Sequence, residues 1–92
     1  MSTRENELKT IAYELLTTKQ NSDNLRIEIV RTQFEETSGE KVYFCTFEFD
    51  GEYGEAWFNT KQAEQFPNLR QVINIHEYLL LKEQQQEFIY FQ

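Results

Sequence analysis

The N-terminal part of the chain has apolar residues spaced as on one face of an α-helix. Ser2 and Glu5 have the spacing of a capping box, in which the first residue caps the helix and the second reaches back to it. Four turn-forming residues, Asn21 to Asn24, then end the pattern. We therefore expect an amphipathic helix from about residue 3 to residue 19, with an apolar stripe formed by Leu8, Ile11, Ala12, Leu15 and Leu16.

Two strands are predicted next, because the period of the apolar residues changes from about 3.6 to 2. Leu25, Ile27 and Ile29 alternate with charged residues, which is typical of a half-buried strand. The alternation shifts at Val30 and continues at Phe34, so we expect a β-bulge there. After the polar segment 35–40, one face of a second strand carries Tyr43, Cys45, Phe47 and Phe49, and the other carries Phe44, Thr46, Glu48 and Asp50.

Asp50-Gly51 is the strongest hairpin signal in the chain, because this dipeptide favours a two-residue turn. Such a turn places small residues of the third strand opposite large residues of the second, which leaves room for the large side chains. A longer loop would change the register and therefore every pair. The predicted pairs are Phe49 with Glu52, Glu48 with Tyr53, Phe47 with Gly54, Cys45 with Ala56 and Phe44 with Trp57.

Two helical segments are predicted after the hairpin. Asn59 or Thr60 caps a short helix, and Pro67 starts another, because proline fits the first helical position. The order of elements is α-β-β-β-α, an α+β fold with a three-stranded antiparallel sheet packed against helices. The last helix has a stripe wider than that of a surface helix, so we expect more than one of its faces to be covered. This stripe comprises Leu69, Val72, Ile73, His76, Leu79 and Leu80, and it is widened by Ile75, Tyr78 and Leu81.

Length and charge narrow the classes of function. The 92 residues correspond to a single domain, residues 1–92. The net charge is −7, and between residues 35 and 60 seven acids face one base, a net charge of −6. The remainder of the chain is nearly balanced. The acidic segment is expected to repel nucleic acid and to attract basic surfaces, through a field that decays over about 8–10 Å at physiological salt.

Candidate catalytic and metal-binding residues are few. Cys45 is the only cysteine, which excludes an internal disulfide, and its apolar strand face predicts a core residue. His76 is the only histidine and is expected to pack in the core or at an interface. A hydrolase using these two residues is an alternative without a supporting motif, and no cluster has the spacing of metal ligands. We therefore expect a non-enzymatic protein without cofactor or metal. Because no signal peptide or membrane span is present, we also expect a cytoplasmic protein.

The acids are expected to share a surface with exposed aromatic side chains. Acids that only kept the protein soluble would be mixed with lysines, whereas aromatic residues among acids are typical of a recognition surface. Alternate residues of a strand recur every ~6.7 Å, about two base-pair rises of B-DNA. We predict a partner-binding surface comprising Glu35, Glu36, Glu40, Glu48, Asp50, Glu52, Tyr53, Glu55 and Trp57, with Glu5, Glu7 and Glu14 as candidate extensions.

The segment FCTFEFDGEYGEAWFNTKQAEQF resembles the second half of a double-stranded-RNA-binding domain. That family begins its last helix with Ser-Lys-Lys-x-Ala-Glu, and Thr60-Lys-Gln-Ala-Glu64 has the same spacing. Only Lys61 of the basic cluster remains, and the surrounding acids would oppose RNA phosphates. The resemblance therefore supports the topology, and a module of this kind acting as a protein–protein adaptor is the alternative function.

The whole chain resembles the Arn anti-restriction proteins of T-even bacteriophages, through its 92-residue length, its opening STRENELKTIAYELLTTKQNSDNLRIEIV and its acidic hairpin. The resemblance implies a DNA mimic that binds and inhibits McrBC, the host restriction endonuclease specific for modified cytosine. It implies no catalytic residues, because members of this family are inhibitors. A thin core, the wide stripe of the last helix and the terminal FIYF also predict a homodimer.

Overall fold

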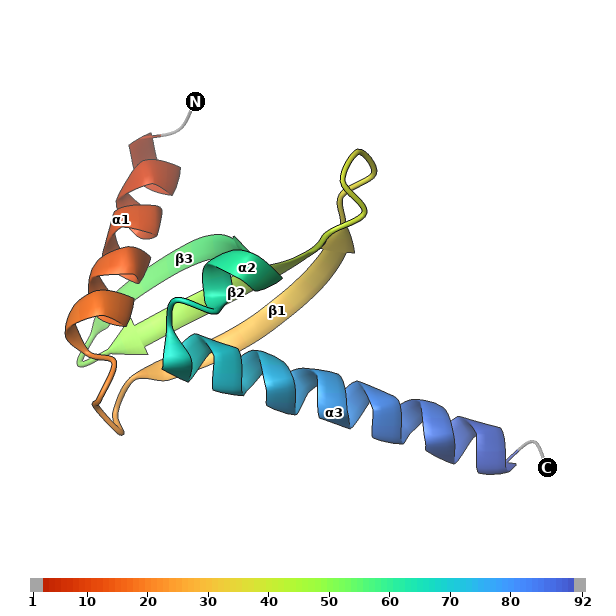
Figure 1. Ribbon diagram of the computed structural model, residues 1–92. Coiled ribbons are helices and arrows are strands. Elements are labelled where there is room, and N and C mark those ends of the chain that lie inside the picture. The colour runs from red at the N-terminus through yellow and green to blue at the C-terminus, as the bar shows by residue number, and fades with distance from the viewer. Residues whose placement is uncertain (1–2, 91–92) are drawn as a thin grey trace.

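The computed structural model describes the backbone of residues 3–90 and the side chains of residues 3–84. Three antiparallel strands form one sheet in the order β1-β2-β3, as Figure 1 shows. The predicted α-β-β-β-α fold is confirmed, whereas the expected cap at Ser2 and the terminal FIYF lie outside the described side chains. The elements are α1 (Thr3–Thr18), β1 (Arg26–Phe34), β2 (Lys41–Phe49), β3 (Glu52–Asn59), α2 (Thr60–Ala63) and α3 (Pro67–Tyr90).

The β2–β3 hairpin turns on two residues, as predicted. Asp50 and Gly51 have φ angles of 49° and 86°, and a type I′ turn requires positive φ at both central positions. This turn fixes the register, and each of the five predicted pairs from Phe49–Glu52 to Phe44–Trp57 is present. The side chains of the two strands therefore project to the two faces as the sequence predicts.

A β-bulge interrupts β1 at the predicted place. The pairing with β2 shifts between Ile29 and Arg31, which leaves Val30 as the extra residue. Before the bulge Ile27 and Ile29 project toward the helices. After the bulge Arg31 lies opposite Phe44, on the face of the sheet that the helices do not cover.

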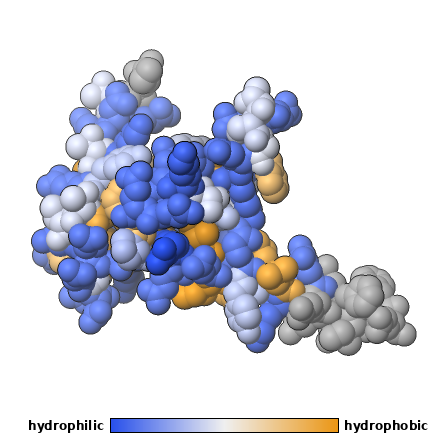
Figure 2. All heavy atoms as spheres, viewed as in Figure 1, coloured by the Kyte–Doolittle hydropathy of each residue, from blue (hydrophilic) through white to orange (hydrophobic). Residues whose placement is uncertain are grey.

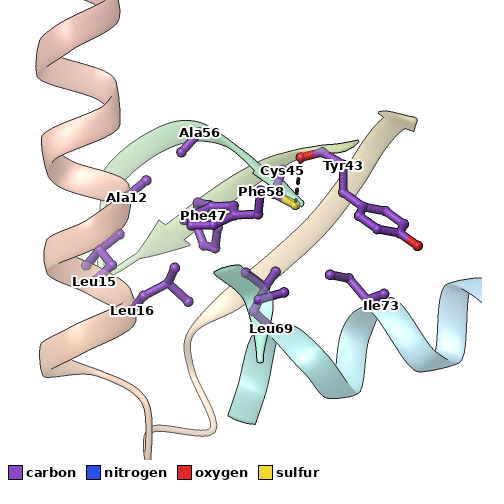
Figure 3. Close-up of a cluster of buried hydrophobic side chains, with 11 residues drawn as sticks. Ala12, Leu15, Leu16, Tyr43, Cys45, Phe47, Ala56, Phe58, Leu69 and Ile73 are labelled. Carbon is purple, nitrogen blue, oxygen red and sulfur yellow. Dashed lines mark hydrogen bonds between the residues drawn. The ribbon is translucent and has the colours of Figure 1, made fainter. Parts of the chain in front are cut away.

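The hydrophobic core lies between one face of the sheet and the three helices (Figure 3). Phe47 and Phe58 are fully buried, with ring centroids 5.8 Å apart in an edge-to-face arrangement. These aromatic rings contribute the largest apolar surface to a small core. The remaining buried residues are Ala12, Leu15, Leu16, Tyr43, Cys45, Ala56, Ala63, Leu69 and Ile73.

Helix α1 crosses β3 at Gly54, where the two backbones approach closely. A Cβ atom at Gly54 would lie 2.5 Å from the backbone nitrogen of Ala12 and 2.8 Å from the carbonyl oxygen of Leu8. No side chain fits at these distances. The sequence predicts a small residue at this position to accommodate the core rings, but the structure assigns the constraint to the backbone of α1.

The start of each C-terminal helix is also as predicted. Asn59 caps α2 in a capping box, in which its side chain accepts from the backbone of Gln62 and the Gln62 side chain accepts from the backbone of Asn59. Pro67 is the first residue of α3. The first turns of α3 bring Leu69 and Ile73 into the core.

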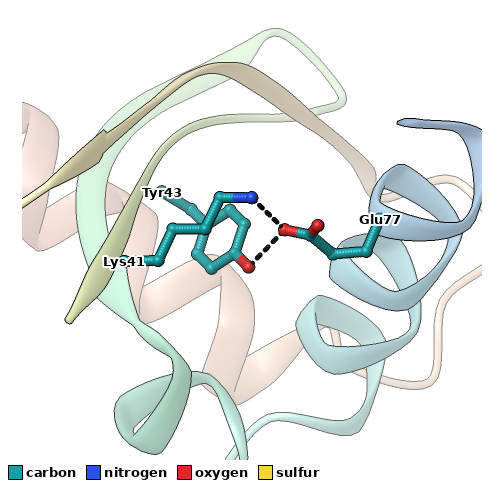
Figure 4. Close-up of polar contacts among 3 residues, drawn as sticks. All are labelled: Lys41, Tyr43 and Glu77. Carbon is teal, nitrogen blue, oxygen red and sulfur yellow. Dashed lines mark hydrogen bonds and ion pairs between the residues drawn. The ribbon is translucent and has the colours of Figure 1, made fainter. Parts of the chain in front are cut away.

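A polar clamp holds α3 against β2 beyond the core (Figure 4). The Lys41 ammonium lies 2.5 Å from Glu77 Oε1, and the Tyr43 hydroxyl donates to the same oxygen at 2.6 Å. Hydrogen bonds from Lys41 and Tyr43 lower the pKa of Glu77 and outweigh the opposing effect of its partial burial. The ionised carboxylate is thus the form that the clamp stabilises.

Past this clamp, α3 leaves the sheet and projects from the domain (Figure 1). Figure 2 shows hydrophobic residues on this projecting part. The sequence predicts Leu79 within a covered stripe, but 54% of its surface is exposed in the single chain. Ile75, Tyr78 and Leu81 are exposed as well. Within the described part of the chain, no helix is both long and apolar enough to cross a membrane.

Candidate protein-interaction surface

The sheet has a second face, which none of the three helices covers, because all of them contribute to the core on the opposite side. We call it the open face. The strand register arranges its side chains in four cross-strand rows, each with one residue from β1, β2 and β3. The row Gln33–Val42–Asn59 lies nearest the β1–β2 loop, and the three rows that follow toward the β2–β3 turn are Arg31–Phe44–Trp57, Glu28–Thr46–Glu55 and Arg26–Glu48–Tyr53.

These last three rows carry the charged and aromatic side chains, and they are numbered first to third below.

The first row is an aromatic pair with a cation stacked on it. The rings of Phe44 and Trp57 meet edge to face, with centroids 4.7 Å apart. The Arg31 guanidinium carbon lies 4.8 Å from the Trp57 centroid and 5.4 Å from the Phe44 centroid, within range of a cation–π interaction. Trp57 nevertheless keeps 42% of its surface exposed. A tryptophan placed in this way resembles the anchors that contribute most of the energy in protein interfaces.

The second and third rows bring three carboxylates around Thr46 and Tyr53. The Tyr53 hydroxyl donates to Glu55 Oε2 at 3.0 Å. Partial burial, followed by this hydrogen bond and the charges of Glu55, Glu28 and Glu48, raises the pKa of Tyr53. The phenol therefore stays protonated and continues to donate, and the three carboxylates act together on one part of the open face.

The predicted acids do not form a single patch, because they lie toward opposite ends of the sheet (Figure 1). Glu35, Glu36 and Glu40 belong to the β1–β2 loop, where Glu35 accepts hydrogen bonds from two loop hydroxyls and Glu40 accepts one from Asn59. Figure 2 shows this loop as largely hydrophilic. Asp50 and Glu52 lie at the β2–β3 turn. The nine-residue strand β2 separates the two groups by about 27 Å.

None of the predicted acids is neutralised by an ion pair among the side chains that the structure describes. The ion pair found there joins Lys41 to Glu77, outside the predicted surface. Glu55 is half-buried and the other six acids of the predicted set are exposed, so all are open to solvent. Their charges therefore add to a negative field around the hairpin, which salt will screen.

A hollow lies beside the open face, between the first turns of α1 and strand β3. Its volume is about 490 Å³. The chemistry of its lining is mixed, with carboxylates, bases and aromatic rings within one depression. The lining includes Glu5, Lys9, Arg31, Phe44, Glu55 and Trp57. Of the candidate extensions on α1, Glu5 thus adjoins the predicted surface.

The predicted grouping of Glu48, Tyr53, Glu55 and Trp57 on one face is confirmed by the register. The open face also contains Arg26, Glu28 and Arg31, which the predicted surface does not include. Glu28 lies on a strand outside the acidic segment, and Arg31 joins the aromatic pair only because the bulge shifts the pairing. The alternation of Glu28 with Ile27 and Ile29 was a usable signal for its face.

Cys45 is a fully buried core residue, as predicted, and its thiol lies 3.7 Å from the carbonyl oxygen of Tyr43. Burial raises the pKa of Cys45 to about 12, so the thiol is protonated at neutral pH and inaccessible to a substrate. The ring of His76 meets the ring of Tyr43 edge to face, with centroids 6.5 Å apart. No cluster of potential metal ligands occurs among the described residues.

Comparisons with protein-family models, with curated proteins and with solved structures found no match. Function is therefore inferred from the arrangement of the chain's own residues. That arrangement combines carboxylates without ion pairs among the described side chains, at both ends of the sheet and on its open face, with the exposed side chains of Tyr53 and Trp57. Its chemistry favours a positively charged macromolecular surface as the ligand.

Proposed function

We propose that the protein binds the basic, DNA-contacting surface of another protein and blocks it by acting as a DNA mimic. The observation that carries this proposal is the set of solvent-accessible hairpin acids without ion pairs. Acids that only maintained solubility could be mixed with lysines, whereas a mimic needs its charges unpaired. The β1–β2 loop, the open face and the β2–β3 turn supply these charges.

The length of strand β2 supports this proposal. The two groups of acids at the ends of this strand are separated by about 27 Å, which equals about eight base pairs of B-DNA. Glu28, Glu55 and Glu48 lie between them on the open face. A basic groove that tracks a DNA backbone over this length would meet carboxylates along the same path.

The resemblance to Arn-type anti-restriction proteins narrows the partner. It favours McrBC, the restriction endonuclease specific for modified cytosine, as the partner, and the cytoplasm of an infected host cell as the proposed location. The protein has no catalytic role in this proposal. Its acids occupy the site that recognises DNA, so inhibition follows from competition.

Competition with DNA tests the proposal. Purified McrBC is immobilised, loaded with the protein and washed with increasing concentrations of a methylated DNA duplex. A mimic is displaced as the duplex binds, and a single-stranded oligonucleotide of the same composition serves as the control. If the protein remains bound at saturating duplex, or does not bind at all, mimicry of this enzyme's substrate is ruled out. Retention would favour the adaptor function instead.

The protein is also proposed to act as a homodimer. The exposed apolar side chains of Ile75, Tyr78, Leu79 and Leu81 on α3 support this, because a second copy would cover them. A dimer would also carry twice the number of acids. Sedimentation equilibrium at tens of micromolar should give about twice the 11.1 kDa of the chain. A variant with Tyr78→Ser and Leu81→Ser should sediment as a monomer, and a monomeric wild type would contradict the proposal.

A further inference from the structure

The hollow beside Trp57 contains the groups with which proteins bind a guanidinium. Its volume of about 490 Å³ falls within the usual range of ligand sites. Glu5 from α1 and Glu55 from β3 contribute carboxylates to its lining, and Trp57 and Phe44 contribute aromatic rings. Carboxylates accept the paired N–H groups of an arginine, and aromatic faces attract its delocalised charge.

The chain itself demonstrates that these rings accept a guanidinium. Arg31 stacks on both, 4.8 Å from the centroid of Trp57 and 5.4 Å from that of Phe44. It does so without an ion pair to any described carboxylate, so the rings hold the cation. The part of the indole that remains exposed is available to a second group.

We propose that this hollow binds an arginine side chain of the partner, stacked on Trp57 and hydrogen-bonded to Glu55 and Glu5. The inference rests on the proposed function, since a DNA-contacting surface is the expected source of such an arginine. Arginine suits the site better than lysine, because a planar guanidinium both stacks and donates two parallel hydrogen bonds. The contact would add a specific anchor to the otherwise diffuse attraction between charges.

Two bases in the lining, Lys9 and Arg31, oppose an incoming cation. The guanidinium of Arg31 is already engaged with the rings, and the neighbouring carboxylates Glu28 and Glu48 raise the negative potential of the open face. A cation is therefore the preferred ligand. If an acidic ligand bound between Lys9 and Arg31 instead, the assignment would be wrong.

Trp57 is the only tryptophan of the chain, so its fluorescence reports on this site alone. We would titrate the protein with tetra-arginine amide at low ionic strength and follow the tryptophan emission. The expected result is a saturable change, with tetralysine amide binding at least about threefold more weakly. Tetraglutamate should produce no change.

Two variants with the same change of charge locate the contact. Glu55→Gln should weaken tetra-arginine binding about threefold to fivefold, the effect of losing one exposed ion pair. Glu83→Gln removes an exposed acid from α3, outside the hollow and the predicted surface, and should change binding by less than about twofold. Thermal unfolding monitored by circular dichroism verifies that both variants fold.

Several outcomes overturn the inference. Equal losses in the two variants would mean that arginine is attracted by net charge without a site. Calorimetric binding with unchanged tryptophan emission would place the peptide elsewhere, and preferential binding of tetraglutamate would reverse the chemistry. Because the peptide assay needs no nuclease, it separates failure of this site from failure of the mimic. If the protein binds arginine at this site but does not bind McrBC, the site is supported and the proposed function is wrong.

Discussion

The two faces of the sheet are built from alternate residues of the same strands, yet they differ in almost every property. The covered face has buried apolar side chains such as Phe47 and Phe58, and no polar or charged side chain is buried among the described residues. The open face has carboxylates, the two arginines Arg26 and Arg31, Tyr53 and a partly exposed Trp57. The helices that bury one face leave the other accessible.

Because of this difference, one of two neighbouring residues in a strand contributes to stability and the other is available for binding. Trp57 and Phe58 are adjacent in β3, as are Gly54 and Glu55, but each pair divides between the two faces. A substitution on the covered face should therefore destabilise the fold. A substitution one residue away should leave the fold intact and alter binding.

The largest expected contrast compares Phe58→Ala with Trp57→Ala. Loss of the buried Phe58 ring should lower the free energy of unfolding by about 3–5 kcal/mol, because it leaves a cavity in a small core. Loss of Trp57 should lower it by only about 1–2 kcal/mol, the value of its contacts with Phe44 and Arg31. Urea unfolding followed by circular dichroism measures both. Equal losses would mean that the open face also forms part of the core.

A smaller contrast is expected between Gly54→Ala and Glu55→Gln. The added methyl group would collide with the backbone of α1, so the helix must shift, at an expected cost of about 1–3 kcal/mol. The Glu55 change keeps an acceptor for the Tyr53 hydroxyl and should cost less than about 0.5 kcal/mol. If Gly54→Ala unfolds at the wild-type urea concentration, α1 does not cross β3 as closely as described.

The smallest effect is expected at the clamp that extends the covered face, and it depends on pH. Folding lowers the pKa of Glu77, so its contribution to stability is present above its ordinary pKa of 4.5 and is lost as the pH falls through the folded value. Glu77→Gln should remove less than about 1 kcal/mol at neutral pH, because the clamp is partly exposed.

The Glu77→Gln variant should also lose less stability than the wild type on acidification. Glu83→Gln, an exposed change on the same helix, is the matched control and should lose as much stability on acidification as the wild type. Unfolding free energies measured at about pH 7 and about pH 3.5 test the difference. Identical losses in the wild type and in Glu77→Gln would exclude the clamp as a source of pH-dependent stability.

Local sequence signals predicted the fold well where one residue type determines the backbone. Asp50-Gly51 determined the turn and hence the register of β2 and β3, and Pro67 marked the start of α3. The shift of the apolar phase at Val30 located the bulge. Each of these features depends on residues that are close in sequence.

Features that depend on distant contacts could not be predicted in this way. The Glu77 clamp joins residues more than thirty positions apart, and nothing in the spacing of Lys41 and Tyr43 identifies their partner. The acidic segment is continuous in sequence, but the antiparallel strands carry its two ends to opposite ends of the sheet. Charge counted along the chain therefore predicted the acids of the surface but not their distribution, and it omitted Glu28.

The most direct test of the central claim removes four hairpin charges while keeping their shapes. Glu48→Gln, Asp50→Asn, Glu52→Gln and Glu55→Gln are combined in one variant, and Gly51 remains so that the turn is preserved. A control variant carries Asp23→Asn, Glu64→Gln, Glu83→Gln and Glu87→Gln, which removes four acids outside the hairpin, the predicted surface and its candidate extensions. Both should fold, because exposed substitutions rarely cost more than about 0.5 kcal/mol each.

The measured quantity is inhibition of McrBC cleavage at low and at physiological salt. The hairpin variant should inhibit about tenfold or more weakly than the wild type at low salt, since up to four ion pairs of ~0.2–1 kcal/mol are lost. The control should retain most of its inhibition, and wild-type inhibition should weaken as salt screens the acids. If the folded hairpin variant inhibits as strongly as the wild type, or if wild-type inhibition is insensitive to salt, the hairpin acids do not mimic DNA.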